Sequence, residues 1–138
     1  MSKRTFTIIK PDSVRKGNFG KIFTRIESEG FRVLGVKKIA LSQRTAEAFY
    51  SVHRERPFFG SLVEYMTSGP VYVVALEGNG AVASLRKLMG ATDPTKAEAG
   101  TIRKEFGESI EQNAIHGSDS DENANLEIAF FFAESELV

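Results

Sequence analysis

The fold of this chain is indicated first by one short, continuously apolar stretch, Val71-Tyr72-Val73-Val74-Ala75-Leu76. Successive side chains of a strand point to opposite faces of the sheet, so an uninterrupted apolar run is typical of a strand that is buried on both faces. Gly69 and Pro70 break the chain before it, and a Gly-Asn-Gly turn follows at residues 78–80. The stretch therefore predicts a central strand.

Apolar spacing on either side of this strand predicts the other elements. Residues 5–9 and 31–41 read as strands, and the first should end at Lys10 because Pro11 cannot donate to a ladder. Apolar residues three or four apart predict helices over residues 19–28, 42–53, 59–66, 82–89, 102–106 and 120–132. Residues 90–100 read as a long loop. A fourth strand is weakly encoded, near His116 or close to Phe130, and the order of elements indicates an α/β or α+β sandwich.

Composition limits the classes of protein to which the chain can belong. Its 138 residues fit one domain over residues 1–138, and zero net charge argues against a general nucleic-acid binder. The absence of cysteine excludes disulfides and thiolate zinc sites. No apolar run approaches the length of a membrane span, so no membrane partner is expected. We expect a cytoplasmic protein with a small-molecule partner.

Charge is distributed unevenly along the chain. All eighteen Lys and Arg residues lie within residues 1–104, together with nine of the eighteen carboxylates. Residues 105–138 carry the other nine carboxylates and no basic residue except a histidine. Any cations that serve chemistry in this acidic segment must therefore come from earlier in the chain.

Two stretches resemble nucleotide-binding patterns without matching them. Residues 15–22 (RKGNFGKI) resemble the end of a P-loop, but Ile22 stands where Ser or Thr should bind magnesium. Residues 78–83 (GNGAVA) fit G-x-G-x-x-A, yet no strand ending in an acid follows the next helix. A tight turn between a strand and a helix explains the second pattern better.

The strongest candidate for chemistry is Asn113-Ala114-Ile115-His116-Gly117-Ser118-Asp119. His116 lies on no periodic apolar stripe, and imidazole offers an unprotonated ring nitrogen near neutral pH. Ser118 could hydrogen-bond a partner of the ring, and Glu127 could orient it. In a chain without a thiol or a G-x-S-x-G motif, phosphorus is the more plausible electrophile.

Other candidates each have a structural alternative. His53 is either a hydrogen-bonded ring in a pocket wall or a residue that supports the substrate. Phe58 and Phe59 could stack a base or pack in the core. A phosphoryl-transfer site needs cations and hydrogen-bond donors. Five such residues lie at loop-like positions or at the ends of elements: Lys10, Arg86, Thr92, Arg103 and Asn113. Each of them alone could equally be a solvated surface residue.

Several motifs in one order resemble the nucleoside diphosphate kinase family, of the bacterial type, over essentially the whole chain. They are residues 7–14 (TIIKPDSV), 55–59 (ERPFF), 66–70 (MTSGP), 88–92 (LMGAT), 100–103 (GTIR) and 113–119 (NAIHGSD). The resemblance implies a ferredoxin-like α/β sandwich, in which a four-stranded antiparallel sheet is covered by helices on one face. It also implies that residues 90–115 form a loop over the site.

The same resemblance implies a ping-pong reaction. A nucleoside triphosphate, typically ATP, would phosphorylate the pros nitrogen of His116, and a nucleoside diphosphate would then take the phosphate with little base specificity, which maintains the nucleotide pools. Mg²⁺ would be held mainly through nucleotide phosphates, without a dedicated protein metal site. The family forms dimers that assemble into tetramers or hexamers, so a homo-oligomer is expected.

Site residues carry over by position. The resemblance implies that phosphates, ribose or the catalytic ring contact Lys10, Tyr50, Arg86, Thr92, Arg103 and Asn113. Phe58 and Leu62 should line the base site, and Ser118 and Glu127 should support His116. Ala99 and Lys104 depart from common family residues, without touching the expected chemistry.

Two other classes remain as alternatives. A ferredoxin-like sheet could serve as a binding or regulatory module, and a histidine could receive phosphate from a partner protein in a phosphorelay. A kinase would lose turnover when His116 is replaced, whereas a binding module would keep its affinity. Phosphorelay modules are usually helical bundles, which the β-rich segments contradict.

Overall fold

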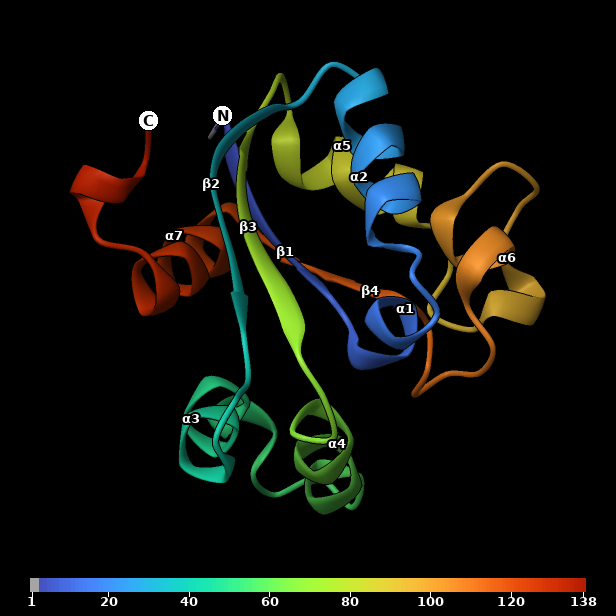
Figure 1. Ribbon diagram of the computed structural model, residues 1–138, viewed down its shortest axis with the longest axis vertical. Coiled ribbons are helices and arrows are strands. Elements are labelled where there is room, and N and C mark those ends of the chain that lie inside the picture. The colour runs from blue at the N-terminus through green and yellow to red at the C-terminus, as the bar shows by residue number, and fades with distance from the viewer. Residues whose placement is uncertain (1–2) are drawn as a thin grey trace.

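A computed structural model describes residues 3–138 and contains one four-stranded antiparallel sheet (Figure 1). The strand order is β2 (Arg32–Ile39), β3 (Val71–Glu77), β1 (Arg4–Ile9) and β4 (Ile115–Gly117). The apolar stretch at residues 71–76 lies in β3, one of the two central strands, as predicted. The predicted four-stranded antiparallel sheet is confirmed.

Helices cover both faces of this sheet. Alternate residues of β3 enter two separate apolar clusters, with Val73 on one side and Val74 on the other. The cluster around Val74 includes residues of α2 (Phe19–Ser28) and α5 (Ala81–Met89). The cluster around Val73 includes residues of α3 (Gln43–Phe49), α4 (Phe59–Met66) and α7 (Asp121–Phe131). The expectation of helices on one face was therefore wrong, because Ile9 of β1 and Val74 and Leu76 of β3 place apolar side chains on the second face as well.

Several elements differ in detail from the predictions. The helix expected over residues 42–53 divides into α3 and a 3₁₀ turn, η1 (Ser51–His53). The fourth strand forms at His116 and not at Phe130, which lies in α7; the Ser120 side chain caps this helix by accepting the Asn123 N–H at 3.0 Å. A short helix that was not predicted, α1 (Pro11–Arg15), follows β1. No helix within residues 3–138 has the length and apolar character needed to cross a membrane.

The segment expected to be a loop over the site is partly helical. It contains the 3₁₀ turn η2 (Pro94–Lys96) and α6 (Ile102–Phe106), and it lies beside the α1 end of the sheet (Figure 1). Another 3₁₀ turn, η3 (Glu134–Glu136), follows α7. Residues 90–115 therefore form one side of the molecule as well as a border of the site.

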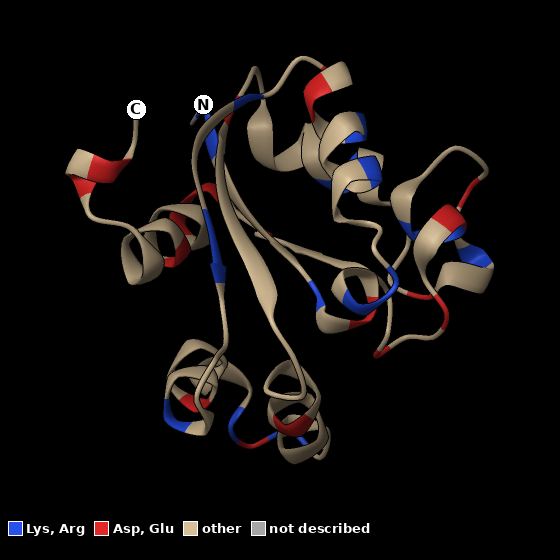
Figure 2. Cartoon of the chain, in the orientation of Figure 1, with Lys and Arg blue, Asp and Glu red and all other residues tan. Residues whose placement is uncertain are grey.

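Ion pairs join the basic and acidic parts of the chain, whose charged residues are coloured by sign in Figure 2. Four of the five Lys or Arg ion pairs in the described residues connect residues 4–37 with carboxylates of residues 105–138: Arg4–Glu134, Lys16–Glu108, Arg25–Glu105 and Lys37–Glu136. These side chains are substantially exposed, so each pair contributes little to stability. Their shared direction nevertheless matches the charge asymmetry of the sequence.

The backbone conformation at Gly90, at the end of α5, can be tested by mutation. Gly90 has φ +88°, and an added Cβ would lie 2.5 Å from Thr101 Oγ1 and 2.7 Å from Thr101 Cβ. Gly90→Ala should therefore lower the free energy of unfolding by about 2 kcal/mol, because it combines a strained φ with a steric clash. Urea denaturation measures this change.

Gly20→Ala is the matched control. Gly20 lies in α2, and nothing lies within 4 Å of a Cβ added there. This replacement should raise the free energy of unfolding by about 0.5 kcal/mol, because it reduces the freedom of the unfolded chain. Equal stabilities for the two variants would contradict the described geometry at Gly90.

Candidate active site

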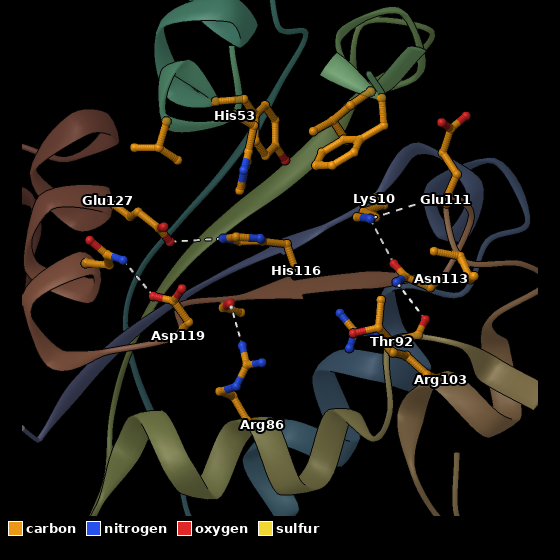
Figure 3. A pocket seen from close by; sticks show the side chains of 17 residues that line it. Lys10, His53, Arg86, Thr92, Arg103, Glu111, Asn113, His116, Asp119 and Glu127 are labelled. Atoms are coloured by element: carbon orange, nitrogen blue, oxygen red, sulfur yellow. Dashed lines mark hydrogen bonds and ion pairs between the residues drawn. The ribbon is translucent and has the colours of Figure 1, made fainter. Parts of the chain in front are cut away.

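One cavity of about 590 Å³ contains nearly all the site residues predicted from the sequence (Figure 3). Ten of the eleven line it: Lys10, Tyr50, Phe58, Leu62, Arg86, Thr92, Arg103, Asn113, His116 and Glu127. The eleventh, Ser118, is buried beside Glu127. Residues from distant parts of the chain therefore converge on one space.

Pairing of β4 with β1 brings His116 to this space. In the ladder, Ile8 lies opposite His116. The Lys10 N–H continues the pairing by donating to the Ala114 carbonyl at 3.0 Å, and the Ser118 N–H donates to the Phe6 carbonyl at 3.1 Å. The end of β1 and the segment 113–118 are thus fixed side by side.

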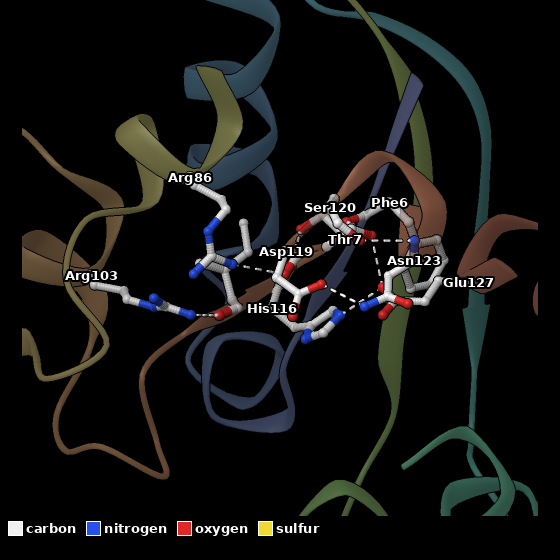
Figure 4. Close-up of polar contacts among 12 residues, drawn as sticks. Phe6, Thr7, Arg86, Arg103, His116, Asp119, Ser120, Asn123 and Glu127 are labelled. Carbon is white, nitrogen blue, oxygen red and sulfur yellow. Dashed lines mark hydrogen bonds and ion pairs between the residues drawn. The ribbon is translucent and has the colours of Figure 1, made fainter. Parts of the chain in front are cut away.

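The ring of His116 is held by a carboxylate (Figure 4). His116 Nε2 lies 2.9 Å from Glu127 Oε1, which also accepts the Ser118 hydroxyl at 2.7 Å. A carboxylate only accepts hydrogen bonds, so this contact favours the proton on Nε2. The Nδ1 atom then carries an unshared electron pair, and within residues 3–138 it has no hydrogen-bond partner. The site therefore offers one ring nitrogen as a nucleophile.

Lys10, Asn113 and Thr92 form a chain of hydrogen bonds along one wall. Lys10 Nζ donates to Asn113 Oδ1 at 2.8 Å, and Asn113 Nδ2 donates to the Thr92 carbonyl at 3.0 Å. Burial first, and then the nearby charge of Arg103, lower the pKa of Lys10 to about 8, against the opposing effects of Asp12 and Glu111. The Lys10 ammonium is consequently poorly solvated and available to an anion.

Two arginines lie beside the histidine and donate to backbone carbonyls (Figure 4). Arg103 Nη2 donates to Ile115 O at 2.8 Å and Arg103 Nη1 to Gly90 O at 3.1 Å, while its Nε is buried without a partner in the described structure. Arg86 Nη1 donates to Gly117 O at 3.4 Å. Burial and the neighbouring Arg86 lower the pKa of Arg103 to about 10, so it remains charged near neutral pH.

The three cations therefore have mainly neutral partners. None of the ion pairs formed by the described residues includes Lys10, Arg86 or Arg103. Two guanidinium groups and one ammonium group face the same cavity, where planar arginine forks suit phosphate oxygens. This arrangement favours an anion with several oxygen atoms.

Aromatic and apolar residues form the outer part of the cavity. The Phe58 side chain is 48% exposed, its ring centroid lies 5.5 Å from that of His53, and Leu62 is close along α4. Phe58 is therefore available for stacking, whereas Phe59 packs against the core. His53 lines the same cavity, and no hydrogen bond of its ring is found in the described structure.

Tyr50 lies deeper in the cavity. Its hydroxyl is buried without a partner in the described structure, and its ring meets the His116 ring edge-on with centroids 6.4 Å apart. Burial, and the nearby Glu127 charge, raise the pKa of Tyr50 well above its usual value, so the hydroxyl stays protonated. The unsatisfied O–H is available to a bound ligand.

Sequence reasoning did not assign roles to several other residues that line the cavity: Val52, Ile110, Glu111, Asp119 and Asn123. Ile110 is 62% exposed and apolar in an otherwise polar loop, a signal that only the fold makes meaningful. The Asn123 side chain donates to Asp119 at 2.6 Å, and this contact lowers the pKa of the Asp119 carboxyl. The residues that depart from the family pattern, Ala99 and Lys104, do not line the cavity.

No ready-made metal cage is present within residues 3–138. These residues contain no group of three or more His, Asp or Glu side chains able to hold a metal ion. The carboxylates that line the cavity are Glu111, Asp119 and Glu127, and Glu127 is already bonded to His116 and Ser118. A divalent ion here would need ligands from a bound molecule.

Comparison with known proteins gives one consistent family. Residues 3–137 match the family model described as "Nucleoside diphosphate kinase". The chain is 61% identical to the nucleoside diphosphate kinase of Nitratiruptor sp. over 99% of both chains, and 61% identical to that of Granulibacter bethesdensis over 99% of this chain and 97% of the relative.

Solved structures agree with this result. The Aquifex aeolicus nucleoside diphosphate kinase superposes with a TM-score of 0.96 at 45% identity, covering 99% of both chains. The enzyme from Halobacterium salinarum, solved in complex with CDP, superposes with a TM-score of 0.95 at 42% identity, covering 100% of this chain and 92% of that chain. Sequence and structure together show that the chain belongs to the nucleoside diphosphate kinase family.

Proposed function

We propose that this protein moves the γ-phosphate of a nucleoside triphosphate, typically ATP, to a nucleoside diphosphate by way of a phosphohistidine at Nδ1, the pros nitrogen, of His116. The observation that carries this proposal is the Nε2 contact with Glu127, which leaves Nδ1 as the nucleophilic atom. Family membership supports the same phosphotransferase activity.

The proposed first step is a displacement at phosphorus. The Nδ1 electron pair forms a bond to the γ-phosphorus, and the bond from that phosphorus to its bridging oxygen breaks, so that a nucleoside diphosphate leaves with the bridging electron pair. The Glu127 carboxylate stabilises the positive charge that develops on the ring, and the proton stays on Nε2 in a hydrogen bond to Glu127. The second nucleoside diphosphate attacks the phosphohistidine and reverses these steps.

The cations have the proposed role of holding phosphate oxygens. Lys10, Arg86 and Arg103 face the space beside His116, and the unpaired Nε of Arg103 and hydroxyl of Tyr50 are further donors. Thr92 and Asn113 line the same wall and would contact phosphate or ribose. Preorganised donors of this kind stabilise the charge that spreads over the transferred group.

Phe58 and Leu62 would line the base site. An exposed ring can stack on any base, whereas hydrogen bonds to base edges would select one. The partly exposed Phe58 therefore supports broad base specificity, and with it a role in maintaining the pools of nucleoside triphosphates.

Mg²⁺ is the proposed cofactor. It keeps several waters and is commonly bound by one or two carboxylates together with substrate phosphates. Asp119 lines the cavity with His116, and its carboxylate accepts a hydrogen bond from the neutral Asn123 amide, so it would be the carboxylate available to the ion. When bound, the ion would neutralise charge on the phosphate oxygens. The protein residues would position the nucleotide around it.

Assembly and location follow from family resemblance. We propose one domain over residues 1–138, a homo-oligomer built from dimers, as a tetramer or hexamer, and a cytoplasmic location, where the nucleotide substrates are pooled. The described sheet supports assembly in one respect, because β2 is an edge strand with Val36 44% exposed. No specific nucleic acid and no membrane are proposed as partners.

Replacing the nucleophile tests the reaction directly. The wild-type protein mixed with γ-³²P-ATP and Mg²⁺ should acquire acid-labile label that moves to added GDP, and His116→Ala should acquire none, because Nδ1 of His116 forms the bond to phosphorus. His53→Ala is the matched histidine control and should still take up label. An unlabelled wild-type protein that remains folded would contradict the proposed function.

Arg103 should matter more for turnover than for folding. Arg103→Ala removes charge next to the transferred group, so kcat should fall about 100-fold. Arg25→Ala is the control, since Arg25 bonds Glu105 and Gly100 O but does not line the cavity. Kinetics measures kcat, and urea denaturation measures stability. If Arg103→Ala lowered kcat no more, relative to its loss of stability, than Arg25→Ala does, the assignment of Arg103 to the site would be wrong.

The pH dependence of kcat/KM should report Lys10. Its pKa in the free protein is about 8, so protonated Lys10, the form that attracts phosphate, is lost as the pH rises through that value. A plot of kcat/KM against pH should therefore decline above about pH 8. In Lys10→Arg the side chain stays charged, so this decline should disappear even if the maximal kcat/KM is lower. An unchanged decline in this variant would show that another group causes the decline.

A further inference from the structure

A buried carboxylate outside the cavity contacts the backbone of the catalytic segment. Asp12, in α1, is 1% exposed and does not line the cavity. Its Oδ2 accepts the Ala114 N–H at 3.1 Å, and its Oδ1 accepts the Tyr65 hydroxyl. A buried charge needs such partners to be tolerated, so Asp12 is fixed between α4 and the segment that precedes β4.

The backbone at Ala114 is strained. Ala114 has φ +75° and is the only residue other than glycine with a positive φ among residues 3–138. The Ile115 N–H donates to the Asn113 carbonyl at 2.9 Å, which closes a three-residue turn around Ala114. This φ value and this hydrogen bond match the γ-turn that is rare and strained in proteins. Strain of this kind persists only where the surroundings hold it.

Residues 10–13 hold both polar atoms of Ala114. Its N–H donates to Asp12, and its carbonyl accepts the Lys10 N–H at 3.0 Å and the Ser13 hydroxyl at 3.2 Å. Ala114 and Ser13 are fully buried, so water does not compete for these bonds. The turn is therefore clamped from one side by the end of β1 and the start of α1.

Tyr65 braces the clamp from α4. Its hydroxyl donates to Asp12 Oδ1 and accepts the Asp12 N–H at 2.8 Å. This reciprocal pair fixes the Asp12 side chain relative to its own backbone. The turn it supports lies between two site residues, Asn113, which bonds Lys10, and His116, which bonds Glu127.

We propose that Asp12, braced by Tyr65, is a positioning residue that holds the strained turn at Ala114 and thereby sets Asn113 and His116 in place for phosphoryl transfer. This inference rests on the proposed function. It adds residues of α1 and α4 that touch neither the nucleotide cavity nor the reacting atoms. Small displacements of a nucleophile are costly, since a misplacement of about 1 Å can reduce the rate about 100-fold.

The charge of Asp12 also acts on Lys10. The charged groups that affect Lys10 are Arg103 from α6, Glu111 from the following loop, and Asp12 from α1. Asp12 and Glu111 favour the protonated ammonium, whereas burial and Arg103 oppose it. Loss of the Asp12 charge should therefore make Lys10 release its proton at lower pH.

Asp12→Asn and Tyr65→Phe separate the charge from the brace. Asp12→Asn keeps the shape and one acceptor but removes the charge, so kcat should fall about 10-fold and the alkaline decline of kcat/KM should move to lower pH. Tyr65→Phe removes the brace and keeps the charge, so kcat should fall by a similar factor while the decline stays in place. KM should change less than kcat in both variants.

Tyr72→Phe is the matched control. Tyr72 lies in β3 with its ring stacked on Phe19, and it is neither a hydrogen-bond partner of Asp12 nor a lining residue of the cavity. This variant should keep the wild-type kcat. The proposal would be overturned if Asp12→Asn and Tyr65→Phe both kept the wild-type kcat and pH profile. It would also be overturned if kcat fell only in proportion to the fraction of protein that is unfolded.

A structural measurement separates this inference from the proposed function. Amide hydrogen exchange at Ala114, followed by NMR, should be at least about 10-fold faster in Asp12→Ala than in wild type, because the N–H loses its buried acceptor. Ala114→Gly added to Asp12→Ala should restore part of the kcat, since glycine adopts a positive φ without a brace. Unchanged exchange would overturn the clamp itself, whereas a wild-type protein with a protected amide and no phosphotransfer would defeat only the proposed function.

Discussion

The pairing of β4 with β1 is the contact on which the site depends. β4 has only three residues, and a strand this short is marginal without further support. Hydrogen bonds beyond the ladder, from Lys10 to Ala114 and from Ser118 to Phe6, extend the pairing at both ends. Because β1 is a central buried strand, this pairing joins the histidine of the acidic C-terminal segment to a cation from the basic N-terminal part.

The cations of the site rest on neutral acceptors. Lys10 bonds an amide oxygen, and Arg86 and Arg103 bond backbone carbonyls. An incoming phosphate therefore need not break an ion pair, and a departing one leaves groups that retain hydrogen bonds. The same cavity would have to release one nucleotide and accept another in each cycle, so weak and replaceable partners favour exchange. Strong carboxylate partners would instead compete with every substrate.

From simple chemistry the sequence predicted strands over residues 5–9 and 71–76 and a candidate nucleophile, but it assigned the remaining site residues only through family resemblance. Val71–Leu76 is apolar enough to require burial, and His116 had no rival base in an acidic segment. Each cation alone resembled a surface charge, and their convergence depends on long-range pairing. Asp12 and the positive φ of Ala114 were not predictable, because the partners that stabilise them lie about a hundred residues apart.

The order of elements along the chain has a consequence for synthesis. Residues 1–104 carry eighteen basic side chains and nine carboxylates, a net charge of +9 (18 − 9), before the acidic segment has left the ribosome. Three of the four strands are also complete by then, whereas His116 and Glu127 emerge later. Chains grow at about 5–20 residues per second, so for seconds the synthesised part of the chain is positively charged and lacks His116. Neutrality and a complete site therefore arrive together, when the acidic segment docks.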